Sequence, residues 1–189
     1  MLNDSPPPVH GPPHPLALDL IERLSDHPGA RVLEIGSGSG RNTRALVAAG
    51  LRVCSLPPDE RCIAALSTHA LLHGTPASLA ELLDRIAAAL EPKAPLFATF
   101  GSVFDSRYGT GDEREPHVFV PRDGDEAGVA HVYFDQERLR AILTPRFTIE
   151  SLREVEVDRI AGDWAHPTAP LHGAVHWFVV AHARSIARE

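Results

Sequence analysis

The sequence predicts an α/β fold with a reduced, mostly parallel sheet that ends in an antiparallel strand pair. Three observations support this prediction. An apolar run at 31–35 passes through a glycine-rich turn into an amphipathic stretch at 41–49, as in the first half of a βαβ unit. A second strand–helix–strand pattern occupies 62–100. Two late strand-like segments, at 147–157 and 175–181, can then pair antiparallel.

The amino-terminal part of the chain divides into an arm and the start of a domain. Residues 1–15 are rich in proline and poor in apolar side chains, so we expect a flexible arm. The remaining residues, 16–189, have a length suited to one domain. A broad apolar face predicts a helix over 16–26, and the apolar run after the first glycine turn and helix predicts a second strand over 51–56.

The stretch 62–74 has two interpretations. Residues 62–66 suit a short buried strand followed by a turn of helix. Alternatively, one helix begins at Pro58 and ends at Gly74, since proline favours the first turn and glycine the stop. The strand is favoured because it matches the family resemblance given below.

The elements after Gly74 are signalled by caps and periodicity. Thr75 is a plausible N-cap, and Pro76 suits the first turn of a helix whose apolar residues recur at helical spacing. The expected elements are a helix over 76–90, strands over 96–100, 117–120 and 130–134, and a helix from Asp135 to Leu143.

Composition excludes several classes of protein. The 189 residues carry a formal net charge of −7 without a cluster of Lys and Arg, which disfavours a nucleic-acid partner. No apolar run is long enough to span a bilayer, and the first residues lack a secretion signal. Cys54 and Cys62 make neither a disulfide framework nor a zinc pattern, so we expect a cytoplasmic protein with no membrane contact.

The glycine-rich turn after the first strand is the most specific signal in the chain. It reads Glu-Ile-Gly-Ser-Gly-Ser-Gly from Glu34 to Gly40. A dinucleotide fingerprint would need a third glycine where Arg41 stands, and a phosphate-binding loop would need Gly-Lys-Ser/Thr. An NAD-dependent oxidoreductase is therefore a weaker interpretation.

The pattern Glu-x-Gly-x-Gly-x-Gly resembles motif I of class I S-adenosylmethionine-dependent methyltransferases. Residues 62–100 resemble the fourth strand, following helix and fifth strand of that family, and 176–183 resemble its last strand. The resemblance implies a Rossmann-like three-layer methyltransferase fold and S-adenosylmethionine as cofactor. It also implies a set of cofactor-binding residues: Glu34, Gly36, Ser37, Gly38, Gly40, Asn42, Ser67, Thr68 and His69.

One part of the family pattern is missing. An acidic residue that holds the ribose should end the second strand, near Leu56 or Pro57. Asp59 or Glu60 could be displaced substitutes or solvated loop charges. Only 57–61 separate the candidate second and fourth strands of the family, too few for the usual helix and strand between them. A homodimer partner or the proline-rich arm could cover the resulting apolar edge.

Residues that would bind the methyl acceptor have weaker signals in the sequence than the cofactor loop has. The segment 102–131 is expected to supply the acceptor pocket for a small molecule. His131 or His117 could act as a general base near neutral pH, and Tyr108 could line the pocket. His69, which the resemblance places at the cofactor, is a further candidate at this pocket, so the catalytic candidates are His131, Tyr108 and His69.

The sequence leaves two alternatives to a plain enzyme with an organic cofactor: a metal site and an inactive binding module. His69 and His73 are four residues apart, but a third ligand is not apparent, so no metal is expected. A chain that lost its ribose anchor could also be an inactive, methyltransferase-like binding or interaction module. Methyl transfer itself needs little beyond alignment, so the lack of an obvious catalytic constellation does not count against it.

Overall fold

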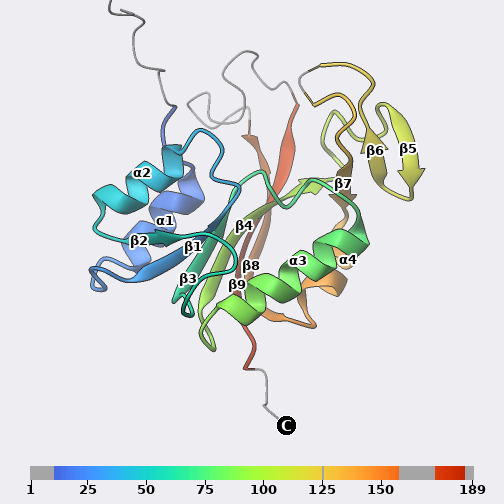
Figure 1. Ribbon diagram of the computed structural model, residues 1–189. Helices are drawn as coiled ribbons and strands as arrows, with labels where there is room; N and C mark the ends of the chain where they lie inside the picture. The colour runs from blue at the N-terminus through green and yellow to red at the C-terminus, as the bar shows by residue number, and fades with distance from the viewer. Residues whose placement is uncertain (1–10, 125, 158–172, 186–189) are drawn as a thin grey trace, which may run out of the picture.

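A nine-stranded mixed sheet forms the centre of the computed structural model, which describes residues 11–124, 126–157 and 173–185. The strands are β1 (Arg31–Ile35), β2 (Arg52–Cys54), β3 (Ala64–Ser67), β4 (Pro95–Ser102), β5 (Asp112–Glu115), β6 (Val118–Val120), β7 (His131–Phe134), β8 (Phe147–Glu156) and β9 (Val175–Ala183). Strands β2, β1, β3 and β4 are parallel neighbours in that order. β9 runs antiparallel between β4 and β8 (Figure 1). The predicted α/β fold with its late antiparallel pair is confirmed.

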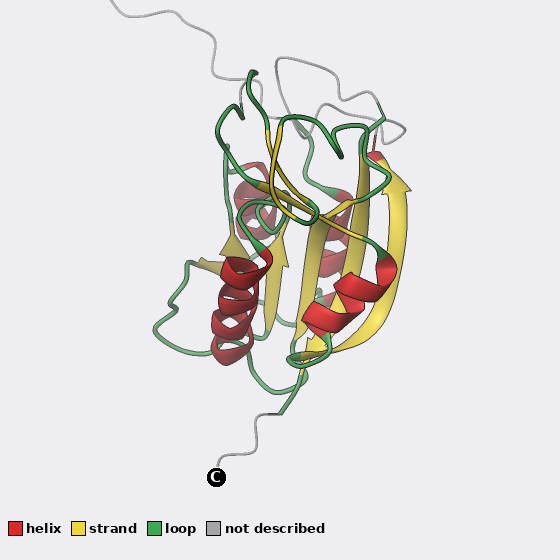
Figure 2. Ribbon diagram, turned by 90° about the vertical axis from the view of Figure 1, so that its right-hand side faces the viewer, coloured by secondary structure: helices red, strands yellow, loops and turns green. Residues whose placement is uncertain are grey.

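Helices cover both faces of this sheet (Figure 2). They are α1 (Pro15–Arg23), α2 (Arg41–Ala48), α3 (Pro76–Ala89) and α4 (Gln136–Leu143). Leucines of α1 and α2 pack with Leu66 and Phe97 in one core, while α3 and α4 contribute to the other core with Leu33 and Phe100. The result is three layers. None of these helices is long and apolar enough to cross a membrane, among the residues that the structure describes.

A small antiparallel unit leans over one end of the main sheet. β7 pairs with β4 only at Gly101 and Ser102, and β6 and β5 extend outward from β7. This unit stands at the carboxyl ends of the parallel strands (Figure 1). β6 and β7 were predicted, whereas β5 was missed because its residues are all charged and mostly exposed. β5 is a strand because it pairs with β6, and its sequence has no alternation of apolar residues.

The ambiguous stretch at 62–74 contains a strand, as favoured. β3 lies directly beside β1 in parallel register, with Val32 opposite Ala64 and Ile35 opposite Ser67. β2 lies on the other side of β1, so the chain at 55–63 crosses β1 without forming a helix. The helix and third strand that the family resemblance places here are therefore absent from this fully described link.

Helix caps follow the sequence signals closely. Thr75 and Ser78 form a capping box at the start of α3, and the Asp135 carboxylate accepts from the Arg138 amide at the start of α4. The beginning of α1 differs from the expectation. The part of the proline-rich arm at 1–10 lies outside the described residues, but His14 is buried as the N-cap of α1. The described end of that arm is thus part of the domain.

Glu150 on β8 fastens α1 to the sheet. The Arg23 guanidinium donates to both of its oxygens, at 2.8 and 2.7 Å, and also lies 5.3 Å from the centre of the Phe97 ring. His182 contacts the same carboxylate at 2.5 Å. The hydrogen bonds from Arg23, and then from His182, lower the pKa of Glu150 to about 2.

We expect Glu150→Gln to destabilise the protein by about 0.5–1 kcal/mol at neutral pH, since the ion pair is partly exposed and screened. A carboxyl whose pKa is lowered on folding stabilises the fold above its unfolded pKa and loses that contribution as pH falls through about 2. Urea unfolding at pH 7 and pH 2 measures the difference in the free energy of unfolding between wild type and Glu150→Gln. Glu81→Gln, at an exposed position of α3, is the charge-matched control. An equal difference between wild type and variant at both pH values would contradict the assignment.

Candidate functional site

The loop between β1 and α2 has the backbone that its glycines predict. Gly36, Gly38 and Gly40 have φ values of +74°, +49° and +75°, a region that other residues rarely adopt. A Cβ on Gly36 would lie 2.4 Å from the Ala70 Cβ, so this glycine lets the loop pack against the chain after β3. A Cβ on Gly38 would have no atom within 4 Å. Gly38 therefore faces open space beside the carboxyl end of β1.

Glu34 brings a buried carboxylate to this loop. Its side chain is only 7% exposed, and its Oε2 accepts a 2.6 Å hydrogen bond from the Thr43 hydroxyl. Its Oε1 is buried without a hydrogen-bond partner among the described residues. Burial raises the pKa of Glu34, partly offset by the Thr43 hydrogen bond. A buried carboxylate with one unsatisfied oxygen suits a ligand that supplies a hydrogen-bond donor or a positive charge.

Polar side chains behind the loop hold it in place. The Asn42 amide donates to the Thr68 hydroxyl at 2.9 Å and accepts from the His14 amide at 2.9 Å. The Ser67 hydroxyl donates to the Ile35 carbonyl. Ser37 is exposed in the loop, where its carbonyl accepts from the Gly40 amide. Asn42, Ser67 and Thr68 thus join the ends of β1 and β3 through their own hydrogen bonds.

The substitute ribose anchors considered from the sequence are not at this site. Glu60 forms an ion pair with Arg31, the first residue of β1. Arg31 lies at the amino end of the strand, and the glycine loop follows the carboxyl end. Glu60 therefore cannot reach a ligand at the carboxyl end of β1. It lines a separate cavity of about 350 Å³ with Asp59, Pro57 and the last turns of α3. Of the two interpretations of Asp59 and Glu60, charges of a surface loop fit this position and a displaced ribose anchor does not, because the link runs back along the sheet.

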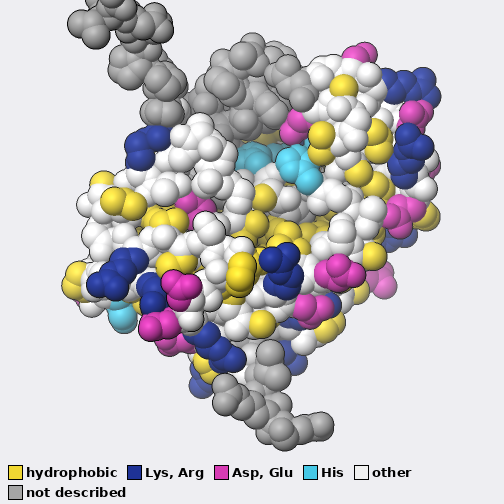
Figure 3. Space-filling view, viewed as in Figure 1, with side chains coloured by type: hydrophobic (Ala, Val, Ile, Leu, Met, Phe, Trp, Pro, Cys, Tyr) yellow, Lys and Arg dark blue, Asp and Glu magenta, His cyan; other side chains and the backbone are white. Residues whose placement is uncertain are grey.

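Histidine side chains gather at the carboxyl edge of the sheet, between the α1–α2 side and the β5–β6 hairpin (Figure 3). His69 has φ +66°, and its amide donates to the Thr99 hydroxyl at 2.8 Å. Its ring lies 5.0 Å from that of His176 and 5.7 Å from that of His14. Burial, and then the charges of Arg41 and His176, lower the pKa of His14 to about 3. His14 is therefore neutral at physiological pH.

A line of charged groups joins this cluster to a second one. The His176 Nε2 lies 3.7 Å from the Asp105 carboxylate, which the Arg107 Nε contacts at 3.1 Å. The Arg107 Nη1 lies 3.4 Å from the Glu126 carboxylate. Burial alone would lower the pKa of Arg107, but the charge and hydrogen bond of Asp105, and then the charge of Glu126, raise it overall. Asp105, Arg107 and Glu126 were missed by the sequence analysis, because loop residues carry no periodic signal.

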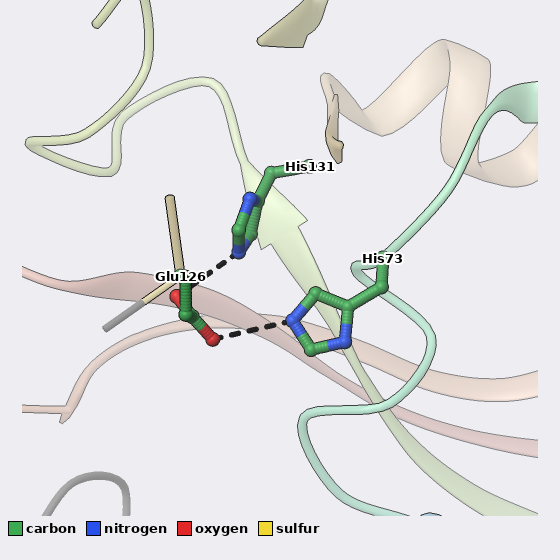
Figure 4. Close-up of side chains that lie close together, drawn as sticks. All are labelled: His73, Glu126 and His131. Atoms are coloured by element: carbon green, nitrogen blue, oxygen red, sulfur yellow. Dashed lines mark hydrogen bonds and ion pairs between the residues drawn. The ribbon is translucent and has the colours of Figure 1, made fainter. Parts of the chain in front are cut away.

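The second cluster contains His73, Glu126 and His131 (Figure 4). The His131 Nε2 lies 3.0 Å from Glu126 Oε2, and the His73 Nε2 lies 3.3 Å from Glu126 Oε1. The two imidazole rings are 4.8 Å apart. The sequence paired His73 with His69, whereas the structure pairs it with His131.

Tyr108 belongs to a third group. Its hydroxyl lies 2.8 Å from His117 Nδ1, and its ring packs against those of Phe119 and Tyr133. Burial raises the pKa of Tyr133 to about 12. His117 and Tyr133 also line a cavity of about 450 Å³ beneath the hairpin, together with Arg138 and Arg146 of the α4 region. The predicted catalytic candidates His69, His131 and Tyr108 therefore belong to three separate groups of side chains at the same end of the sheet.

Comparisons with known structures fit this architecture. A methyltransferase described as S-adenosylmethionine-dependent, from Methanosarcina mazei, matches 92% of this chain and 99% of its own length with a TM-score of 0.66 and 18% identity. The 1,6-didemethyltoxoflavin-N1-methyltransferase of Burkholderia thailandensis matches 90% of this chain and 77% of its own, with a TM-score of 0.62 and 21% identity. A third such enzyme, from Mesorhizobium loti, has a TM-score of 0.58 and 15% identity over 88% of this chain and 97% of its own.

This is the class I methyltransferase fold. Within it, the loop at Gly36–Gly40 corresponds to motif I, the sequence that suggested the family. The structure of the toxoflavin enzyme holds S-adenosylhomocysteine. The methyltransferase fold of this chain keeps the motif I carboxylate and glycines but has a short extended link where the family has its third strand.

Similarity to curated sequences is confined to a short segment. The small-subunit ribosomal RNA methyltransferase A of Erythrobacter litoralis (strain HTCC2594) is 46% identical over an alignment of 52 residues, and the match covers 25% of this chain. The match spans 18% of that relative. No family model matches the chain. The methyltransferase fold is therefore established by architecture, and activity has to be argued from the site.

Proposed function

We propose that this protein transfers a methyl group from S-adenosylmethionine to a small organic acceptor. The observation that carries the proposal is the buried Glu34 carboxylate beside the open Gly38 backbone, at the carboxyl end of β1. Ligands of open parallel sheets bind at this edge, where loops supply the contacts. The unsatisfied Glu34 oxygen and the space over Gly38 fit a cofactor that carries hydrogen-bond donors and positive charge.

The acceptor side favours a small molecule over a nucleic acid. The cavity of about 450 Å³ has the size of a site for an organic ligand, with apolar walls and two arginines at its margin. The net charge of −7 disfavours a polyanionic substrate, although the relative with the short sequence match is named for ribosomal RNA. Arg138 and Arg146 are paired with Asp135 and Asp84, so they do not by themselves select an anionic acceptor.

The chain's own residues can orient an acceptor and handle its proton. When bound, S-adenosylmethionine supplies a methyl group already activated on a sulfonium. His117 lines the cavity, and its Nδ1 lies 2.8 Å from the Tyr108 hydroxyl behind it, so His117 is the candidate that can take a proton from an acceptor. His69 stands close to the glycine loop, next to Ala70, and stays a candidate for contact with the cofactor or acceptor. His131 is less suited as a base because both ring nitrogens are engaged.

Calorimetric titration tests this proposal directly. We expect S-adenosylmethionine and S-adenosylhomocysteine to bind one per chain at micromolar concentrations and to raise the thermal midpoint, since both ligands bind the folded state alone. NADH is the comparison ligand. Tight NADH binding, or the absence of heat and thermal shift with either adenosyl compound at millimolar concentration, would refute the proposal. The homodimer and the cytoplasmic location stay predictions.

A further inference from the structure

His73, Glu126 and His131 are preorganised by the backbone. His73 lies in the loop after β3, and His131 begins β7, where the two residues form an antiparallel bridge. Hydrogen bonds from the Gly74 amide to the Ala130 carbonyl and from the Val132 amide to the Leu72 carbonyl, each 2.8 Å, hold this bridge. Such a bridge brings two side chains together on one side. Glu126 approaches from the loop before β7, so all three point at a common space (Figure 4).

The hydrogen bonding of His131 leaves its Nε2 facing a carboxylate, an arrangement that either a second ring proton or a metal ion would satisfy. Its Nδ1 lies 2.9 Å from the Val129 carbonyl, which can only accept, so this nitrogen carries the proton. In a neutral imidazole, Nε2 then has a lone pair, yet it faces the Glu126 carboxylate at 3.0 Å. Two acceptors at this distance repel one another unless a second proton or a metal ion lies between them.

Charge at the site points in the same direction. Asp105 and Glu126 are both in contact with the single guanidinium of Arg107. The Glu126 carboxylate is thus an anionic group beside two imidazoles, an arrangement that attracts a cation. Arg107 approaches Glu126 Oε2, while His73 lies beside the other oxygen, Oε1.

From these observations we infer that His73, Glu126 and His131 bind a divalent transition-metal ion. Two imidazoles and one carboxylate are a common ligand set for zinc and iron, with a position left open for water or another ligand. The three ligand atoms lie within 4.8 Å of one another, against about 3.4 Å between ligand atoms of a tetrahedral zinc site. His73 and Glu126 are 37% and 26% exposed, so small side-chain rotations can close this difference.

The surroundings of His131 are those of a metal ligand. Histidines that bind metals nearly always donate their other ring N–H to a carbonyl or carboxylate, as His131 does to Val129. Nitrogen ligands favour zinc, cobalt or nickel over magnesium or calcium. The metal would tie the loop after β3 to the insert before β7, at the same edge of the sheet as the glycine loop. This inference does not depend on the proposed methyl transfer.

Metal titration of the untagged full chain tests the inference. After dialysis against a chelator, we expect one equivalent of Zn²⁺ to bind by calorimetry at micromolar affinity or tighter, and Co²⁺ to give the visible absorption of a low-symmetry site. His73→Ala, Glu126→Gln and His131→Ala should each weaken binding by at least about tenfold. His27→Ala, in an exposed turn after α1, is the matched control and should bind as the wild type does.

Several outcomes would overturn the metal site. The first is that the wild type does not bind Zn²⁺. The second is that all three ligand variants bind Zn²⁺ with unchanged affinity, which would place the metal on other histidines of the chain. Glu126→Gln keeps the shape of the side chain but loses the ion pair with Arg107, so circular dichroism of the metal-free variant establishes that it is folded. Loss of Zn²⁺ binding in this folded variant separates a lost ligand from a lost fold.

Discussion

Replacing Gly38 by valine is expected to abolish S-adenosylmethionine binding, with an affinity loss of at least about a hundredfold, or about 2.7 kcal/mol. Two effects combine. The φ of +49° at this position is unfavourable for a β-branched residue, and the new side chain would fill the space that faces the site. Calorimetry with the folded variant measures the loss.

Gly29 provides a control matched in both conformation and space. It has φ +76°, a Cβ there would also have no atom within 4 Å, and it lies in the turn between α1 and β1. We expect Gly29→Val and Gly38→Val to lower the free energy of unfolding by similar amounts, about 1–2 kcal/mol each. Only Gly38→Val should lose cofactor binding. If both variants bound S-adenosylmethionine as the wild type does, the loop would not be the cofactor site.

The sequence predicted those parts of the fold that have local signals. The strand of apolar residues before Glu34, the glycines after it and the capping residue Thr75 each act on neighbours within a few positions, so the pattern is visible without the fold. The strand at β3 could be favoured over a helix because residues 62–100 resemble the fourth strand, following helix and fifth strand of the methyltransferase family. The charged strand β5 has no such pattern, since it exists through its pairing with β6.

The candidate site was predicted only where motif I defines it. Glu34 and Gly38 were identified because the loop is contiguous in sequence. Glu126 meets His73 across 53 positions of the chain, and their approach depends on the bridge between the loop after β3 and the start of β7. His14 was assigned to a flexible arm because prolines surround it, although it is buried against Phe178. Long-range contacts of this kind have no counterpart in spacing or composition.

Glu34→Gln is expected to weaken S-adenosylmethionine binding by about tenfold to a hundredfold while making the cofactor-free protein more stable at neutral pH. The loss of affinity follows from removing a charged hydrogen-bond acceptor. The gain in stability follows from burial, which raises the pKa of Glu34 above its unfolded value. The ionised form is therefore costly inside the fold.

The pH dependence of the stability difference between wild type and Glu34→Gln shows whether the raised pKa of Glu34 causes it. A carboxyl whose pKa rises on folding contributes its full stability below the unfolded pKa and loses it as pH rises through the folded pKa. Thermal midpoints of wild type and Glu34→Gln should therefore converge in acid and separate at pH 7, with the variant higher. The glutamine oxygen can still accept from the Thr43 hydroxyl, so the loop keeps its support. Glu113→Gln, on exposed β5, changes the net charge equally and should alter neither binding nor the midpoint.

A lower midpoint for Glu34→Gln together with unchanged binding would make Glu34 a structural residue and would contradict the proposed site. The opposite combination, higher stability with lost affinity, has a direct physical meaning. A buried carboxylate with one unsatisfied oxygen destabilises the free protein, and a ligand that satisfies that oxygen removes the cost on binding. In that case Glu34 serves cofactor binding, and it lowers the stability of the cofactor-free fold.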